Sequence, residues 1–215
     1  MKTKTALVAG ASGLIGRELL EYLLSSPVYH KVIVLVRREI DLSHHKLVQE
    51  LVDYRNLDLS KIKVDHVFCT LGSTIKKAGS KKAFREVDEV LPLKIARQLH
   101  KNGSELYSIV TAMGANSSSS IFYNKVKGQV ENALQEIGFK HLGIFRPSML
   151  LGDRKESRLG EEIGQRVMSC LDFLTPANYK AIHVKKVALA MLHHAERPKD
   201  GLSIVFSGEM VDLEV

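Results

Sequence analysis

The sequence predicts an α/β fold in which helices cover both faces of a doubly wound parallel sheet. Short apolar, β-branched runs alternate along the chain with segments whose apolar residues recur at helical spacing. A glycine-rich turn joins the first apolar run to the first helical segment. With 215 residues, 45% of them hydrophobic, the chain can bury one α/β core. We therefore predict a single domain over residues 1–215.

The first strand and helix meet in a turn with the spacing Gly-x-x-Gly-x-x-Gly, from Gly10 to Gly16. Gly10 permits a sharp turn, Gly13 lets the main chain approach a ligand, and Gly16 allows close packing of helix on strand. Free N–H groups at a helix N-terminus attract anions such as a pyrophosphate. A ligand-free glycine turn is the alternative, but the helical pattern that continues to Pro27 favours a dinucleotide. The predicted contacts are Gly10, Ser12, Gly13, Leu14 and Ile15.

Residues 31–36 form a continuous apolar run that predicts the second strand, buried on both faces. An NAD-preferring site carries an acidic residue about twenty positions beyond the glycines, where it binds the ribose hydroxyls. This chain has Arg37 and Arg38 there. A guanidinium pairs with a 2′-phosphate, so the pattern favours NADP over NAD. The alternative is that both arginines are solvated after the strand.

Three further strands are predicted at residues 46–52, in the run 64–72, and at 105–111. The carboxyl ends of parallel strands line the ligand crevice of a doubly wound sheet. Leu71 and Gly72 should therefore border the cofactor. The apolar residues of 90–99 predict a helix that Pro92 kinks or restarts.

A helix is predicted from Phe122, and it places Tyr123 and Lys127 four positions apart on one face. A phenol with a pKa near ~10 exchanges protons poorly at neutral pH unless its anion is stabilised, and an ammonium one turn away does this. Thr111, at the end of the fifth strand, is the first candidate to hydrogen-bond the substrate oxygen, ahead of Ser108 and the serines at 117–120. The predicted catalytic residues are Tyr123, Lys127 and Thr111, and the alternative is a surface Tyr–Lys pair.

The motifs at Gly10–Gly16, Tyr123–Lys127, Phe145–Ser148 and Ala181–Val184 span most of the chain. Together they resemble an atypical or extended short-chain dehydrogenase/reductase, namely the small NAD(P)-binding oxidoreductases similar to nucleoside-diphosphate-sugar epimerases. The resemblance implies an NAD(P)-binding Rossmann fold whose substrate-side elements lie mainly within 147–215. It also implies that Asp53 contacts the adenine amino group, although a turn carboxylate is the alternative. Arg146 would border the nicotinamide side.

The resulting functional hypothesis is an NADP-dependent oxidoreductase for a small carbonyl or hydroxyl substrate. The family serine at the end of the fifth strand is replaced by Thr111, and the stretch after Arg146 is short for a protein that binds nucleotide sugars. The alternatives are a redox-responsive NADP-binding regulatory protein and a nucleotide-sugar epimerase. The resemblance further implies possible homodimerisation through the helices after the fourth and fifth strands.

Composition limits the partners that we expect. The net charge is +7, but the basic residues are scattered, and their clusters at Arg37–Arg38 and between Lys76 and Arg85 lack the repeated aromatic residues that stack bases. The second cluster either guards an anionic substrate entrance or keeps the chain soluble. Cys69 and Cys170 read as reduced core thiols, and no metal-spaced cluster occurs. We expect no nucleic acid, membrane or metal, and a cytoplasmic location, because neither a membrane span nor a signal-peptide core is present.

Overall fold

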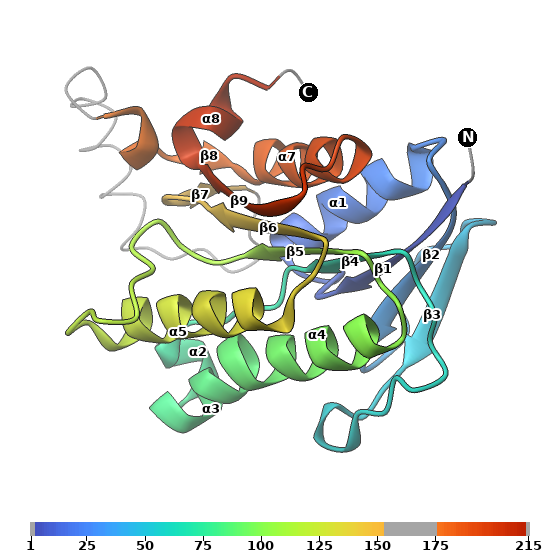
Figure 1. The fold of residues 1–215 in the computed structure, drawn as a ribbon, viewed down its shortest axis with the longest axis horizontal. Coiled ribbons are helices and arrows are strands. Elements are labelled where there is room, and N and C mark those ends of the chain that lie inside the picture. Colours follow the sequence, from blue (N-terminus) through green and yellow to red (C-terminus); the bar gives the residue numbers. More distant parts are fainter. Residues whose placement is uncertain (1–2, 153–175, 214–215) are drawn as a thin grey trace.

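The computed structural model describes residues 3–152 and 176–213. Seven parallel strands form one sheet in the order β3-β2-β1-β4-β5-β6-β9 (Figure 1). The strands are β1 Lys4–Ala9, β2 Tyr29–Val36, β3 Leu47–Leu51, β4 His66–Cys69, β5 Leu106–Val110, β6 His141–Arg146 and β9 Gly201–Phe206. The doubly wound parallel sheet predicted from the sequence is confirmed. The order reverses between β1 and β4, and this reversal marks the topological switch point where such sheets bind ligands.

Helices cover both faces of the sheet (Figure 1). The face with α1 (Leu14–Ser25) and α7 (Val184–Glu196) lies opposite the face with α4 (Leu91–Lys101) and α5 (Phe122–Ile137). Shorter elements complete the described chain: α2 Ile75–Ala78, α3 Lys81–Arg85, the π-helical turn η2 Glu86–Val90, α8 Ser207–Val211, the 3-10 turns η1 Tyr54–Asn56 and η3 Ala177–Tyr179, and the paired strands β7 Leu150–Leu151 and β8 Ile182–His183.

The strands divide their side chains between two hydrophobic cores. Along β1, Ala6 and Val8 pack on the α1–α7 side, while Leu7 and Ala9 pack on the α4–α5 side. All four are fully buried. This alternation follows from the two-residue period of a strand. Both cores hold β1 rigidly, and its carboxyl end carries the glycine-rich turn.

Pro92 acts differently from a simple helix break. The backbone continues from α3 through η2 into α4, with Pro92 in the first turn of α4. Pro92 has no N–H to donate to the Asp88 carbonyl, and the preceding Leu91 N–H donates to Glu86, five residues back. The result is a π-helical turn that places Asp88 inside the protein, with 1% of its surface exposed.

Other predicted elements shift by a few residues. The predicted run 64–72 contains a shorter strand, β4, and its last residues form a loop. The sequence also predicts an amphipathic helix at 161–174 and a charged loop at 150–160. The helix, most of the loop and Cys170 lie outside the described residues. Cys69 is a free, fully buried thiol, as predicted.

Candidate cofactor and active site

The turn after β1 contains glycines at positions where a Cβ would force neighbouring backbone atoms to move. Gly10 has a φ of 95°, and a Cβ there would lie 2.7 Å from the Thr70 carbonyl carbon and 2.8 Å from Leu71 N. A Cβ at Gly16 would lie 2.1 Å from the Gly10 carbonyl oxygen. At Gly13 the nearest contact would be 3.2 Å. The turn is therefore pressed tightly against the end of β4, which leaves its outer side to a ligand.

The N-terminus of α1 begins at this turn. Gly13 is the N-cap residue, no side chain caps the helix, and its first turn carries no acidic residue. Ser12 and Gly13 are exposed, while Leu14 is partly buried and Ile15 is buried. Because uncapped N–H groups and the helix dipole favour an anion, the turn fits a pyrophosphate.

Two further predicted contacts follow β2 and β3 at the same edge of the sheet. Arg37 and Arg38 are exposed directly after β2. Asp53 caps η1, where its carboxylate accepts hydrogen bonds from Arg55 N at 3.0 Å and Asn56 Nδ2 at 2.9 Å. The structure thus gives Asp53 the turn role that was the alternative reading. A contact with adenine stays a prediction.

Tyr123 and Lys127 lie together near the beginning of α5. The Lys127 Nζ is 5.9 Å from the centroid of the Tyr123 ring, and Phe84 packs on the same ring at a centroid distance of 5.5 Å. Lys127 is 4% exposed, whereas Tyr123 is partly exposed. The lysine is therefore enclosed, and the phenol is accessible from outside.

The Lys127 ammonium forms an ion pair with Asp88, a residue that had no predicted role. The Nζ lies 2.7 Å from Asp88 Oδ1, and the two side chains are 5% and 0% exposed. The other carboxylate oxygen accepts a hydrogen bond from Ser73 N at 2.9 Å. Gly72 lies over the pair, since a Cβ there would be 3.5 Å from Asp88 Oδ1 and 3.8 Å from Lys127 Nζ. The loop with Leu71 and Gly72 is thus joined to the Tyr–Lys pair.

Charge keeps the buried lysine protonated. Burial would lower the pKa of Lys127, but the neighbouring Asp88 and Tyr123 outweigh burial and raise that pKa above its usual value. Burial acts in the opposite sense on Asp88 and raises the pKa of its carboxyl group, against the lowering by Lys127 and the Ser73 N–H. At 2.7 Å the ionised pair is the state that we assign, because each charge compensates the other.

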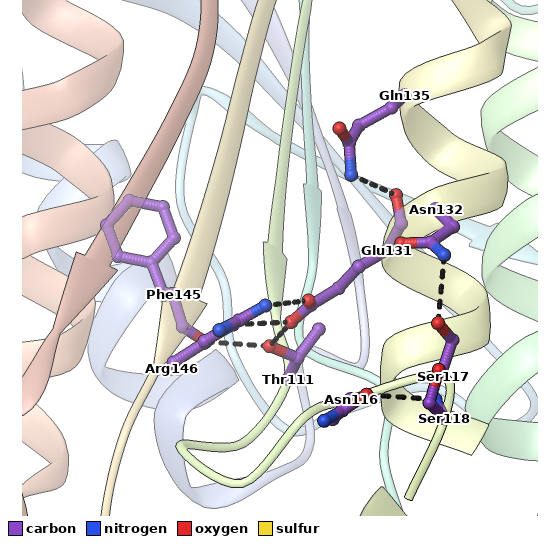
Figure 2. A network of polar contacts seen from close by, with 9 residues as sticks. All are labelled: Thr111, Asn116, Ser117, Ser118, Glu131, Asn132, Gln135, Phe145 and Arg146. Carbon is purple, nitrogen blue, oxygen red and sulfur yellow. Dashed lines mark hydrogen bonds and ion pairs between the residues drawn. The ribbon is translucent and has the colours of Figure 1, made fainter. Parts of the chain in front are cut away.

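Thr111 lies directly after β5, as predicted, and its hydroxyl is hydrogen-bonded within the protein. Figure 2 shows its hydroxyl directed at Glu131, to which it donates a hydrogen bond of 2.6 Å. Arg146 binds the same carboxylate through Nε at 3.0 Å and through Nη2. The hydroxyl proton of Thr111 is therefore engaged by Glu131 in this structure, and a catalytic role of Thr111 stays a prediction. Arg146 remains 19% exposed at its side chain, at the end of β6.

Three of the alternative serines, Ser108, Ser117 and Ser119, have hydroxyl contacts within the protein. Ser108 is fully buried on β5, with its hydroxyl 3.5 Å from His194 of α7, on the other side of the sheet from α5. Ser117 accepts a hydrogen bond from Asn132, and Ser119 accepts one from Ile121 N. Figure 2 shows Ser117 and Ser118 in the loop that packs beside α5.

Sequence reasoning missed both buried acids of the site. Glu131 lies two helical turns beyond Tyr123, so extending the four-residue spacing from Tyr123 through Lys127 would have found it. Asp88 lies four residues before Pro92, which was a signal that its carbonyl lacks a helical partner.

In residues 3–152 and 176–213 no cluster of three or more His, Cys, Asp or Glu could hold a metal ion. Within the same ranges none of the helices has the length and hydropathy to cross a bilayer. An open groove of about 570 Å³ runs along η2 and α4, lined by Arg85, Glu89, Val90, Leu93, Lys94, Arg97 and Gln98. It contains none of the predicted cofactor residues.

Comparison with known proteins identifies relatives that match most of the chain. A protein-family model described as HIM1 matches residues 35–181. The chain is 35% identical over 207 residues to "Protein HTATIP2" of Rattus norvegicus, covering 94% of this chain and 85% of that protein. It is 33% identical over 171 residues to "Protein FMP52, mitochondrial" of Candida albicans, covering 76% of this chain and 75% of that protein.

Solved structures share the fold at low identity. A UDP-N-acetylglucosamine 4-epimerase from Methanobrevibacter ruminantium, in complex with UDP-N-acetylmuramic acid, superimposes with a TM-score of 0.73 at 19% identity, covering 96% of this chain and 77% of that one. MoeE5 in complex with UDP-glucose and NAD gives 0.72 at 16% identity, covering 93% and 74%. These neighbours confirm the predicted Rossmann fold.

The predicted cytoplasmic location is wrong. FMP52 relatives from Candida albicans and three other yeasts are named mitochondrial, which points away from the cytoplasm. The prediction failed because it was based on the lack of a secretory signal core and a membrane span. Neither feature separates a cytoplasmic protein from a mitochondrial one.

Proposed function

The chain belongs to the HIM1 family, and from this premise we propose that it is an NADP-dependent oxidoreductase that exchanges hydride with a small carbonyl or hydroxyl substrate. The observation that carries the proposal is the Tyr123–Lys127 pair. An accessible phenol stands beside a buried, charge-stabilised ammonium. This pair adjoins the loop after β4, at the switch point of the sheet.

The residues present fit a nicotinamide dinucleotide. The cradle that a Cβ at Gly10 or Gly16 would fill, together with the uncapped start of α1, suits a pyrophosphate held by Gly10, Ser12, Gly13, Leu14 and Ile15. Leu71, Gly72 and Arg146 border the inner part of the site, and Asp53 is the proposed adenine contact. When bound, such a cofactor supplies or accepts the hydride.

Tyr123 and Lys127 provide the proton transfer that accompanies the hydride transfer. In the reductive direction the Tyr123 hydroxyl donates its proton to the oxygen of the carbonyl that receives the hydride, and in the oxidative direction the phenolate accepts it back. The Lys127 ammonium stabilises that phenolate by charge, and its burial strengthens the effect because little water screens it.

NADP is the proposed form of the cofactor because of Arg37 and Arg38. Both guanidiniums are exposed beside the end of β2, where they can pair with a 2′-phosphate. Fluorescence titration with NADPH and NADH tests this choice. Equal affinity for the two would remove the role given to the arginines.

The catalytic proposal is tested by screening carbonyl compounds for oxidation of NADPH, followed by the Tyr123→Phe variant. The variant keeps the ring that packs on Phe84 but lacks the hydroxyl, so it should bind NADPH normally and lose turnover. Lys125→Gln is the matched control, since Lys125 is exposed and two positions from Tyr123 on the same helix. Turnover that survives Tyr123→Phe would refute the proton transfer.

The substrate side is proposed to lie within residues 147–215. Ser148 N donates to the Ser207 hydroxyl at 2.7 Å, and Gly208 N donates to Asn178 at 3.1 Å, so C-terminal elements gather at the end of β6.

Pairing of two copies through α4 and α5 also stays a proposal, and light scattering tests it. The names of the FMP52 relatives favour a mitochondrial location, and cell fractionation tests that.

A further inference from the structure

We infer that Asp88 is a positioning residue of this site, which fixes the Lys127 ammonium beside Tyr123 and keeps it protonated while it holds the loop of Gly72 in place. The inference is based on the proposed function, because it explains how the enclosed lysine can serve the phenol.

The contacts of Asp88 join the two halves of the site. One oxygen lies 2.7 Å from Lys127 Nζ, and the other accepts from Ser73 N at 2.9 Å. Lys127 belongs to α5, whereas Ser73 and Gly72 belong to the loop after β4. A single buried carboxylate therefore sets the distance between the proposed cofactor loop and the proposed catalytic helix.

The backbone around Asp88 explains why the acid points inward. Leu91 N–H donates to Glu86, which widens this turn to a π-helix ahead of Pro92. Asp88 is fully enclosed at its side chain, while its neighbour Glu89 is 19% exposed and pairs with Arg85. The two adjacent acids thus have different partners, and Glu89 provides a control from the same turn.

The charges around Lys127 make Asp88 necessary. The titratable groups that face the ammonium are Asp88 on η2, Tyr123 on α5 and Cys69 on β4. Burial raises the pKa of the Cys69 thiol, so this group is neutral near pH 7. Among the neighbours that raise the pKa of Lys127, Asp88 contributes most, and it is the carboxylate among the three groups, so it is the group that compensates the buried ammonium.

The test measures the charge of Lys127 directly, in the full chain and without a substrate. Wild type, Asp88→Asn and Glu89→Gln are labelled with ¹³C-lysine, and the side-chain resonance of Lys127, assigned by its loss in Lys127→Met, is titrated by NMR. In wild type and Glu89→Gln it should titrate above the ordinary lysine range. In Asp88→Asn its pKa should fall by about one to three pH units, the effect of an opposite charge within hydrogen-bond distance.

Each result of the Lys127 titration and of the turnover assays either supports or overturns the role of Asp88. An unchanged titration in Asp88→Asn overturns the inference, as does a wild-type Lys127 that titrates at or below the ordinary range, which is measurable even if the variant does not fold. If a carbonyl substrate is found, Asp88→Asn should lose turnover over the pH range in which its Lys127 becomes neutral, while Glu89→Gln keeps the wild-type pH profile. A uniform loss at every pH indicates a purely structural role and also overturns the inference. Wild type that titrates as expected without any turnover refutes the proposed function alone.

Discussion

The buried histidine of β4 should make the protein sensitive to acid. His66 is fully buried, with Nδ1 2.8 Å from the Tyr29 hydroxyl and Nε2 2.7 Å from Lys4 Nζ. Because an ammonium only donates, Nε2 accepts and Nδ1 carries the single proton. Burial, and then the nearby Lys4, lower the pKa of His66 to about 3, although Asp65 acts to raise it. His141 and His194 act in the same direction as Lys4.

The sign and size of the effect follow from proton linkage. The unfolded chain binds a proton at this histidine below pH ~6.5, whereas the folded chain does so only near pH 3, so unfolding takes up a proton between these values. Stability is therefore fully present above pH ~6.5 and is lost as the pH falls. With these pKa values the free energy of unfolding should fall by about 2 kcal/mol between pH 7 and pH 5 from His66 alone.

Urea unfolding at each pH measures this loss. The chain has no tryptophan, so circular dichroism is the suitable signal. His66→Gln is the informative variant, because its amide can still accept from Lys4 and donate to Tyr29 but does not titrate. The loss between pH 7 and pH 5 should be about 2 kcal/mol smaller in the variant than in wild type. Equal losses in the two proteins would refute the argument.

Three other changes test the site. Gly16→Ala brings a Cβ within 2.1 Å of the Gly10 carbonyl oxygen and should cost about 1–3 kcal/mol and weaken NADPH binding, whereas Gly13→Ala, at 3.2 Å, should cost less; thermal unfolding and NADPH titration compare them. Thr111→Val removes a donor from Glu131 and should lower the free energy of unfolding by about 1–3 kcal/mol in urea, with turnover per folded molecule retained; a loss of turnover as complete as in Tyr123→Phe would instead support the predicted catalytic role of Thr111. Replacing Arg37 and Arg38 together by Gln should reduce NADPH affinity at least about tenfold, equivalent to ~1.4 kcal/mol, and leave NADH affinity unchanged in the same fluorescence assay.

Local patterns predicted the frame of the molecule well. The glycine spacing correctly predicted the turn between β1 and α1, because a Cβ at Gly10 or Gly16 would lie too close to backbone atoms of the turn or of the chain after β4. The spacing of Tyr123 and Lys127 predicted that the two side chains share one face of α5 for the same reason. The doubly wound parallel sheet was predicted because apolar, β-branched runs alternate with helical segments along the chain.

Long-range contacts escaped prediction. Asp88 meets Lys127 only after a π-helical turn and the packing of η2 on α5, neither of which a helical period describes. Thr111 was assigned from its place at the end of β5, but the orientation of its hydroxyl depends on the hydrogen bond to Glu131, twenty residues later in the sequence. Arg37 and Arg38 were placed correctly after β2, and their partner is still to be measured.

The packing of α7 on α1 has a consequence for biosynthesis. The first helix of the chain buries Leu19 and Leu23 in a core that also contains Val187 and Met191 of α7, and Ser26 donates to Glu196 at 2.9 Å. When a ribosome has synthesised only the first half of the protein, the glycine-rich turn and α1 have therefore been made, but α7, which packs on α1, has not. The core between α1 and α7 cannot be completed during synthesis until α7 has been made. A nascent chain stalled before residue 184 would expose the hydrophobic face of α1, a kind of surface that chaperones recognise.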